Sequence, residues 1–323
     1  MRQLVIAERV CLIGHILAKV FGLVGILLVV PNAEIILNLG GVGETAMQMS
    51  MANGGVIDIL FGTIAVSIYA YRLLGWVTTL AFLLPAVSIS VISELLGTST
   101  GFPFGDYSYL SGLGYKIAGL VPFTIPLSWF YVGLSSYLIA RAGLGIAAKP
   151  SLVRHIGAIA LGALLFTCWD FALEPAMSQT NLPFWYWEHP GGFFGTPYQN
   201  YAGWFGTSAL FMSVAALLWR NTPIKLERSQ LSVPLIVYLS NFAFAAGLSL
   251  GSGFVIPVSL GLVLGVLPAL VLWWRGKSGD VRYYLSNTSK LLGDSTAARN
   301  GNCQQPTGIS RGLQDFGSNI THS

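Results

Sequence analysis

The sequence predicts an all-α fold, namely a polytopic membrane helix bundle of about eight transmembrane helices with both termini cytoplasmic. Three observations predict it: a scarcity of charge, a series of long apolar stretches, and a one-sided distribution of Lys and Arg. Only 9% of the 323 residues are charged, against roughly 25% in a typical soluble domain, and the mean hydropathy is +0.66. So few charges exclude an ordinary cytosolic globular protein and a disordered chain.

The apolar stretches define the expected spans. A helix needs about 20 apolar residues to cross roughly 30 Å of hydrocarbon. Eight stretches meet that length, near 10–31, 55–71, 76–97, 119–140, 155–174, 203–219, 232–251 and 254–274. We expect the first to be a span and not a signal peptide, because it holds His15 and Lys19 and no small-residue cleavage site follows it.

The cations orient the spans. With a cytoplasmic amino terminus, nine Lys and Arg residues lie on inner segments before the last span ends, and six more follow it, which is 15 of the 17. The expected outer segments 32–54, 175–202 and 252–253 contain none. Because cytoplasmic loops of membrane proteins carry the excess of Lys and Arg, this bias predicts that both ends lie inside.

Two domains follow from the composition. Residues 1–275 form the predicted transmembrane helical bundle. Residues 276–323 are polar without apolar periodicity, which predicts a disordered cytoplasmic tail. Cys11, Cys168 and Cys303 lie far apart with no CxxC spacing, so neither a disulfide framework nor a zinc site is expected. The net charge of +4 reflects the inner loops and does not indicate a nucleic-acid partner.

A few ionisable residues fall inside the spans, where each is costly and therefore a functional candidate. These are His15, Lys19, Asp58, Glu94, Asp170 and Glu174. The topology places the four carboxyl groups in the outer half of the bilayer, and Asp170 and Glu174 share a helix face because they are four residues apart. We expect His15 to be a hydrogen-bonded packing residue and Lys19 to snorkel or neutralise a carboxylate. Asp58 fits either the site or a helix N-terminus.

The outer loops are rich in aromatic residues and glycine, above all 183–205 and 101–109. An aromatic belt at the bilayer surface is one interpretation. The density of rings between Gly and Pro favours a shaped lid or re-entrant segment, whose rings can hold an apolar ligand or stabilise a cation.

Five motifs carry a resemblance to a known family. They are SELLGTSTGFPFGDYSY at 93–109, PFTIPLSW at 122–129, WDFALEP at 169–175, WYW at 185–187 and GTPYQNYAGWF at 195–205. In this order they resemble the carotenoid biosynthesis membrane-protein family, which includes the carotenoid 1′,2′-hydratases of cyanobacteria (CruF type) and the related bisanhydrobacterioruberin hydratases of archaea. The likeness is densest over about 90–205, and the tail lies outside it.

The resemblance implies a hydro-lyase that adds water to the terminal C-1′=C-2′ double bond of an acyclic ψ end group, as in γ-carotene. The product is a 1′-hydroxy carotenoid, a precursor of myxol-type or bacterioruberin-type carotenoids such as myxoxanthophyll. The implied partners are a membrane-dissolved carotenoid, water, the lipid bilayer and other enzymes of the pathway, without nucleic acid, cofactor or metal. The implied location is the plasma or thylakoid membrane of a bacterium.

Hydration of such an alkene requires a proton donor, a held water and rings that stabilise a tertiary cation. We assign Asp170 as the acid, with Glu174 or Glu94 keeping it protonated and positioning the water, and Asp106 assisting from the loop. The candidate substrate-binding residues are Trp169, Tyr107, Trp129, Trp187, Tyr201, Asn200 and Trp204.

Two other classes of function stay open. Carboxylates within the membrane also fit a proton-coupled transporter, although we find no internal repeat. A carotenoid-binding assembly protein without catalysis is the second. A prenyl-chain elongase is disfavoured because the sequence has no DDxxD pair for a diphosphate–magnesium site.

Overall fold

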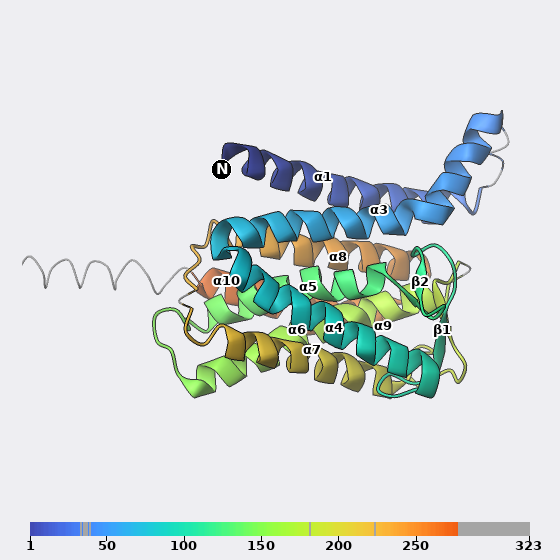
Figure 1. The fold of residues 1–323 in the computed structure, drawn as a ribbon. Coiled ribbons are helices and arrows are strands. Elements are labelled where there is room, and N and C mark those ends of the chain that lie inside the picture. Colours follow the sequence, from blue (N-terminus) through green and yellow to red (C-terminus); the bar gives the residue numbers. More distant parts are fainter. Residues whose placement is uncertain (33, 35–37, 39, 181, 223, 277–323) are drawn as a thin grey trace, which may run out of the picture. The chain divides into compact units, whose positions relative to one another are not determined.

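The computed structural model describes residues 1–276 except 33, 35–37, 39, 181 and 223. This part of the chain is a helix bundle with short strands at one end, as the sequence predicts (Figure 1). The helices are α1 (Arg2–Val24) continued by η1 (Gly25–Val29), α3 (Gly40–Leu74), α4 (Trp76–Thr100), α5 (Thr124–Gly143), α6 (Leu152–Ser178), α7 (Tyr198–Leu218), α8 (Ser232–Gly251), and the continuous α9 (Val255–Gly261), η2 (Leu262–Val266) and α10 (Leu267–Arg275). The strands are β1 (Tyr107–Tyr109), β2 (Lys116–Ile117), β3 (Val121–Pro122) and β4 (Trp185–Trp187).

Seven segments of the described chain are long and apolar enough to cross a membrane. They are Arg2–Val29, Gly54–Leu74, Trp76–Thr100, Leu152–Ser178, Tyr198–Leu218, Ser232–Gly251 and Val255–Arg275. Each corresponds to one expected span. The largest difference is in the first, which starts at residue 2 because the helix continues through Arg9 and Glu8, and Glu8 is buried in an ion pair with Arg72.

The eighth expected span, 119–140, forms α5, which is not among those seven. Helix α5 contacts α3, α4, α6, α7, α8 and α10, and 17 of its 20 residues are buried. A helix surrounded by protein does not need the uniformly apolar surface that lipid requires, so α5 carries Trp, Tyr and Ser side chains and has a lower hydropathy. Its place as an eighth span stays a prediction.

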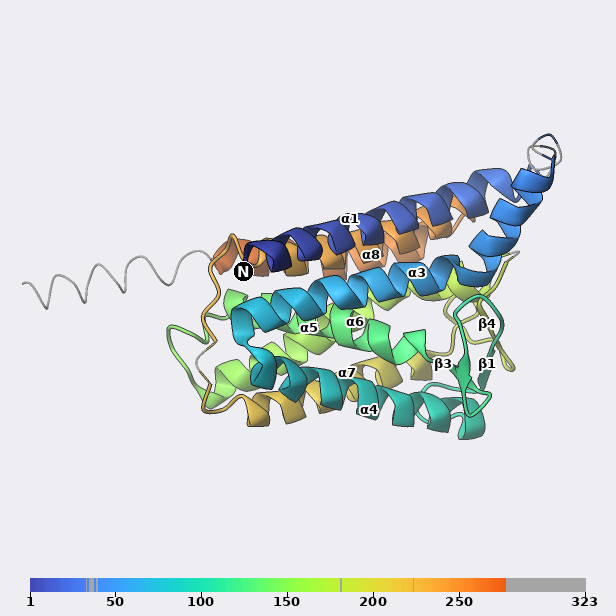
Figure 2. The ribbon, with the colours of Figure 1, turned by 45° about the horizontal axis from the view of Figure 1, so that its top comes forward.

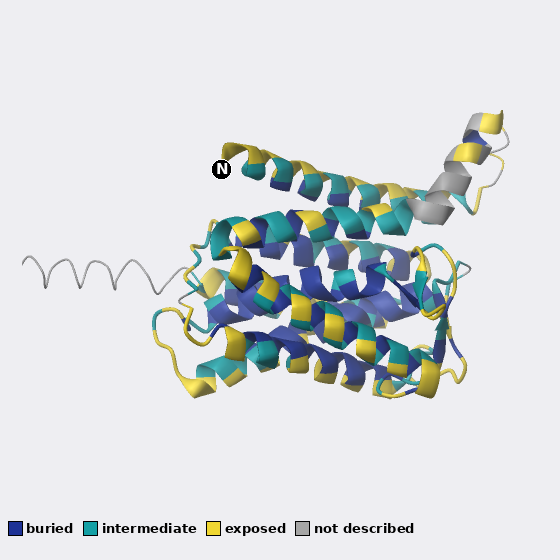
Figure 3. Cartoon of the chain, viewed as in Figure 1, coloured by how far each residue is buried: buried dark blue, intermediate teal, exposed yellow. Residues whose placement is uncertain are grey.

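Successive helices alternate in direction, so the chain has two distinct ends (Figures 1 and 2). The start of α1 and the last turn of α10 lie at one end, which also carries Arg72, Arg141 and Arg154 at or beside helix termini. The short strands lie at the opposite end. Buried residues fill the centre of the bundle, and exposed ones lie on its periphery (Figure 3). Which end faces the cytoplasm stays a prediction, and the predicted tail beyond residue 276 lies outside the described residues.

The strand end is closed by two aromatic segments that pair with each other. Strands β1 and β4 are antiparallel, with Tyr107 opposite Trp187 and Tyr109 opposite Trp185. Because side chains alternate along a strand, these four rings are buried, while Tyr186 between the two tryptophans is exposed. The aromatic loops therefore form a small two-stranded cover over the end of the bundle.

Candidate active site

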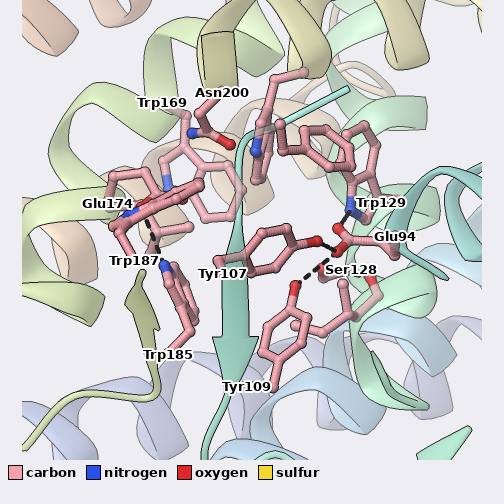
Figure 4. A pocket seen from close by; sticks show the side chains of 14 residues that line it. Glu94, Tyr107, Tyr109, Ser128, Trp129, Trp169, Glu174, Trp185, Trp187 and Asn200 are labelled. Carbon is pink, nitrogen blue, oxygen red and sulfur yellow. Dashed lines mark hydrogen bonds between the residues drawn. The ribbon is translucent and has the colours of Figure 1, made fainter. Parts of the chain in front are cut away.

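Two glutamates from different helices face a small cavity beneath this cover. Glu94 near the end of α4 and Glu174 near the end of α6 are each 3% exposed, and in Figure 4 they lie on opposite sides of the Tyr107 ring. The cavity has a volume of about 40 Å³ and is otherwise lined mainly by aromatic side chains. The lining residues are Glu94, Phe104, Tyr107, Tyr109, Ile125, Ser128, Trp129, Trp169, Leu173, Glu174, Trp185, Trp187, Asn200 and Trp204.

Glu94 accepts three side-chain hydrogen bonds. The hydroxyls of Tyr107 and Tyr109 both donate to Oε2, the latter at 2.9 Å, and the indole of Trp129 donates to Oε1 at 3.0 Å. Burial, followed by the negative charge of Glu94, raises the pKa of Tyr107 and of Tyr109 well above the ordinary value, so both phenols keep their protons and act as donors. A carboxyl group that receives three donors is matched to its ionised form.

Glu174 has a different environment. The indoles of Trp185 and Trp187 donate to the same oxygen, Oε2, at 3.0 and 3.2 Å, which leaves Oε1 free of both indoles. One turn earlier on α6, Asp170 is completely buried and accepts a hydrogen bond at 2.9 Å from Asn200 Nδ2 on α7. Two carboxyl groups so close together in a buried site disfavour double ionisation.

Two glycines allow the segment before β1 to lie against the helices. A Cβ atom at Gly97 of α4 would lie 2.7 Å from the Phe104 ring, and one at Gly203 of α7 would lie 2.6 Å from the same ring. Because only glycine leaves this space, the ring fits between α4 and α7. The hydroxyl of Tyr107, three residues on, then reaches Glu94.

The indoles of the site also pack against one another. Trp129 stacks on Trp204 with 4.6 Å between ring centroids, and Phe166 lies 5.0 Å from Trp129 and 4.9 Å from Trp204. Such a wall of π-faces attracts a positive charge that develops in the cavity.

Most of the predicted site residues gather at this cavity. Eight of them line it: Glu94, Glu174, Tyr107, Trp129, Trp169, Trp187, Asn200 and Trp204. Asp170 and Tyr201 do not line the cavity; Asp170 lies behind the wall that Asn200 forms. Asp106 does not line it either, and its backbone carbonyl accepts a hydrogen bond from Glu188 N beside the β1–β4 pair.

Two hydrogen-bond donors of the site, Tyr109 and Trp185, are not among the residues that the sequence predicts for it. Each lies two residues from a predicted site residue, Tyr107 or Trp187. The two-residue period of a strand is the signal that points to them, but the sequence predicts a shaped lid or re-entrant segment here and not a pair of strands.

Asp58 belongs to a different cluster. Its carboxylate lies 2.8 Å from Lys19 Nζ and 2.8 Å from His15 Nδ1, at the contact of α1 with α3. His15 and Tyr131 both contact Asn241 on α8. The expected neutralisation of a carboxylate by Lys19 is confirmed, and the possibility that Asp58 joins the other carboxyl groups is wrong, because α1 supplies it with two partners.

Within the described part of the chain, no group of three or more His, Cys, Asp or Glu side chains is arranged to hold a metal ion. Cys11 and Cys168 are free thiols, and Cys303 lies outside the described residues.

Comparisons with known proteins agree with the five motifs. A family model described as "Carotenoid biosynthesis protein" matches residues 54–268, which include all the residues of the cavity. A bisanhydrobacterioruberin hydratase from Haloarcula japonica is 38% identical over 126 residues, which are 39% of this chain and 39% of that protein. The aligned part thus spans well under half of the relative. No solved structure matches the chain.

Proposed function

This chain belongs to the carotenoid biosynthesis protein family, and from that membership we propose that it is a hydro-lyase that adds water to a carotenoid. The substrate is an acyclic ψ end group, as in γ-carotene, and the product is the 1′-hydroxy carotenoid. The observation that carries the proposal is the unlike environment of two carboxyl groups across one aromatic cavity. Glu94 receives three donors, whereas Glu174 has a second carboxyl group, Asp170, one turn away on the same helix.

The proton comes from the pair on α6. Asp170 and Glu174 share one proton, because both are buried and close together. Asp170 is the buried member that the sequence predicts as the acid, and Glu174, which lines the cavity, hands the proton to C-2′ of the alkene. The positive charge then lies on C-1′, a tertiary centre.

Water completes the addition. After proton transfer the Asp170–Glu174 pair carries two negative charges, so it is a strong base for the water that attacks C-1′. The proton released by that water returns to the pair and restores its starting state. Glu94 remains ionised and stabilises the cation electrostatically, together with the faces of Trp129 and Trp204.

The size of the cavity bears on how the substrate binds. A volume of about 40 Å³ holds a few water molecules but not an isoprenoid end group, so the carotenoid must part the helices as it enters from the lipid. Ser128 is the one lining residue that is partly exposed, and it is among the three residues of α5 that are not buried. Ile125 and Leu173 are the aliphatic members of the wall. We place the entrance at this edge.

A transporter fits the charges less well. A proton relay needs carboxyl groups free to exchange protons along the membrane. Away from the cavity, Glu8 is paired with Arg72 at 3.0 Å and Asp58 with Lys19 at 2.8 Å. The carboxyl groups that lack a cationic partner in the described spans are those of the cavity and its wall.

The test uses the full-length protein in lipid nanodiscs with γ-carotene and water enriched in heavy oxygen. Wild-type protein should give a 1′-hydroxy product that carries the label, and Glu174→Gln should give none. Glu188→Gln, a change of an exposed carboxylate beside β4, is the matched control and should retain activity. Carotene that is bound but unchanged by wild-type protein would support the non-catalytic assembly role instead.

A further inference from the structure

Four buried polar atoms without hydrogen-bond partners lie in or behind the cavity wall. They are Asp170 Oδ1, Trp169 Nε1, Tyr201 Oη and Thr196 Oγ1. The side chains are between 0% and 9% exposed. They make up four of the eight such atoms in the described part of the chain, and the other four come from Asp58, Tyr69, Ser136 and Trp273.

Three of these residues, Thr196, Tyr201 and Asp170, are neighbours between the turn before α7 and the cavity wall. Thr196 lies in the turn before α7, where its backbone N–H donates to Phe193 O at 2.9 Å. Tyr201, in the first turns of α7, lies near both Thr196 and the Asp170 carboxyl. Asp170 in turn is bonded to Asn200, which lines the cavity, as does Trp169.

An unpartnered buried polar group costs about 1–3 kcal/mol, so four of them in or behind one aromatic wall call for a common explanation. Their chemistry is complementary to water. The carboxylate oxygen accepts, the indole donates, and the two hydroxyls do both. Ordered water molecules bind where two to four such groups converge in a buried site.

We propose that Thr196, Tyr201 and Asp170 form the path by which water enters the cavity from the strand end of the bundle. This inference rests on the proposed hydration. It gives the two substrates separate entrances, since the carotenoid arrives from the lipid at the Ser128 edge. Water from the path forms the C–O bond at C-1′, and its proton goes to the Asp170–Glu174 pair, which has given one proton to C-2′.

The path is tested with variants that remove hydroxyl groups and little else, Thr196→Val, Tyr201→Phe and the double variant. The assay runs in heavy water and measures two products. One is hydrated carotenoid. The other is recovered carotene with deuterium at C-2′, which forms when the cation receives no water and loses the original C-2′ proton to regenerate the alkene.

The double variant should hydrate γ-carotene about tenfold more slowly, the equivalent of a barrier raised by ~1.4 kcal/mol. The ratio of deuterium exchange to hydration should rise, because protonation by Glu174 is intact. Carotene binding, followed by quenching of tryptophan fluorescence, should not change. Tyr69→Phe and Ser136→Ala remove equally buried, unpartnered hydroxyls elsewhere and should leave the ratio at its wild-type value.

Wild-type rates and ratios in the double variant would overturn the path. So would a parallel loss of hydration and exchange, which would assign the hydroxyls to proton donation, or a loss of carotene binding, which would make their role structural. A wild-type protein that neither hydrates nor exchanges deuterium would instead refute the proposed function, so the two failures are distinguishable.

Discussion

The three hydrogen bonds on Glu94 allow a quantitative prediction for Glu94→Gln. The amide oxygen can serve the Trp129 indole, which is only a donor, and the NH₂ group then faces the hydroxyls of Tyr107 and Tyr109, which can rotate to accept. Three hydrogen bonds to a charged group, about 1.5–3 kcal/mol each, are thus replaced by neutral ones of about 0.5–1.5 kcal/mol each. We expect a net destabilisation of about 3–4.5 kcal/mol.

The assay is a double-mutant cycle on the free energy of unfolding, measured in mixed detergent micelles by tryptophan fluorescence. Glu94→Gln and Tyr107→Phe should show a coupling energy of about 1–2 kcal/mol. Tyr238→Phe is the matched control, because this buried phenol donates to the carbonyl of Leu165 at 2.9 Å and not to Glu94. Its coupling with Glu94→Gln should stay within about 0.5 kcal/mol.

Equal coupling in the two cycles would refute the reasoning, because it would mean that the effect of Glu94→Gln spreads through the bundle. A Glu94→Gln protein as stable as wild type would also refute it, since the tyrosines would then have no preference for a carboxylate.

Three further predictions concern the packing, the ion pairs and the sidedness. Gly97→Ala should destabilise the protein by about 1–3 kcal/mol through overpacking, because its Cβ would meet Phe104 at 2.7 Å. Gly206→Ala has open space around it and should be neutral or stabilising. Equal free energies of unfolding for these two variants would contradict the prediction. Lys19→Met should destabilise the protein by about 3–5 kcal/mol, because it leaves the carboxylate of Asp58 without its cation. Adding Asp58→Asn to Lys19→Met should recover part of that loss. If the losses of the two single variants simply add in the unfolding assay, the two residues do not act as a pair. Glu188→Cys, introduced into a protein without native cysteines, should react with an impermeant maleimide in intact cells, and labelling only after lysis would reverse the predicted orientation.

The sequence determined the helices of this protein because each is a local property. A span is an average over about 20 residues set by the thickness of the bilayer, and the expected boundaries 232–251 match α8. The spacing of Asp170 and Glu174 likewise places both on one face of a helix without any tertiary information. Helix α5 is not among the seven segments that hydropathy identifies, because most of its surface contacts protein and not lipid and so need not be uniformly apolar.

Only the tertiary structure decided which polar groups meet. Asp58 and Glu94 look alike in the sequence, as single carboxyl groups in the outer half of a span. Packing of α1 against α3 gives Asp58 a lysine, whereas pairing of β1 with β4 over the bundle gives Glu94 two phenols. The partner of a buried charge is set by contacts between distant segments, and such contacts leave no trace in any single window of the sequence. Hydropathy therefore determined the candidate spans, and helix packing determined which carboxyl groups are left without a cation.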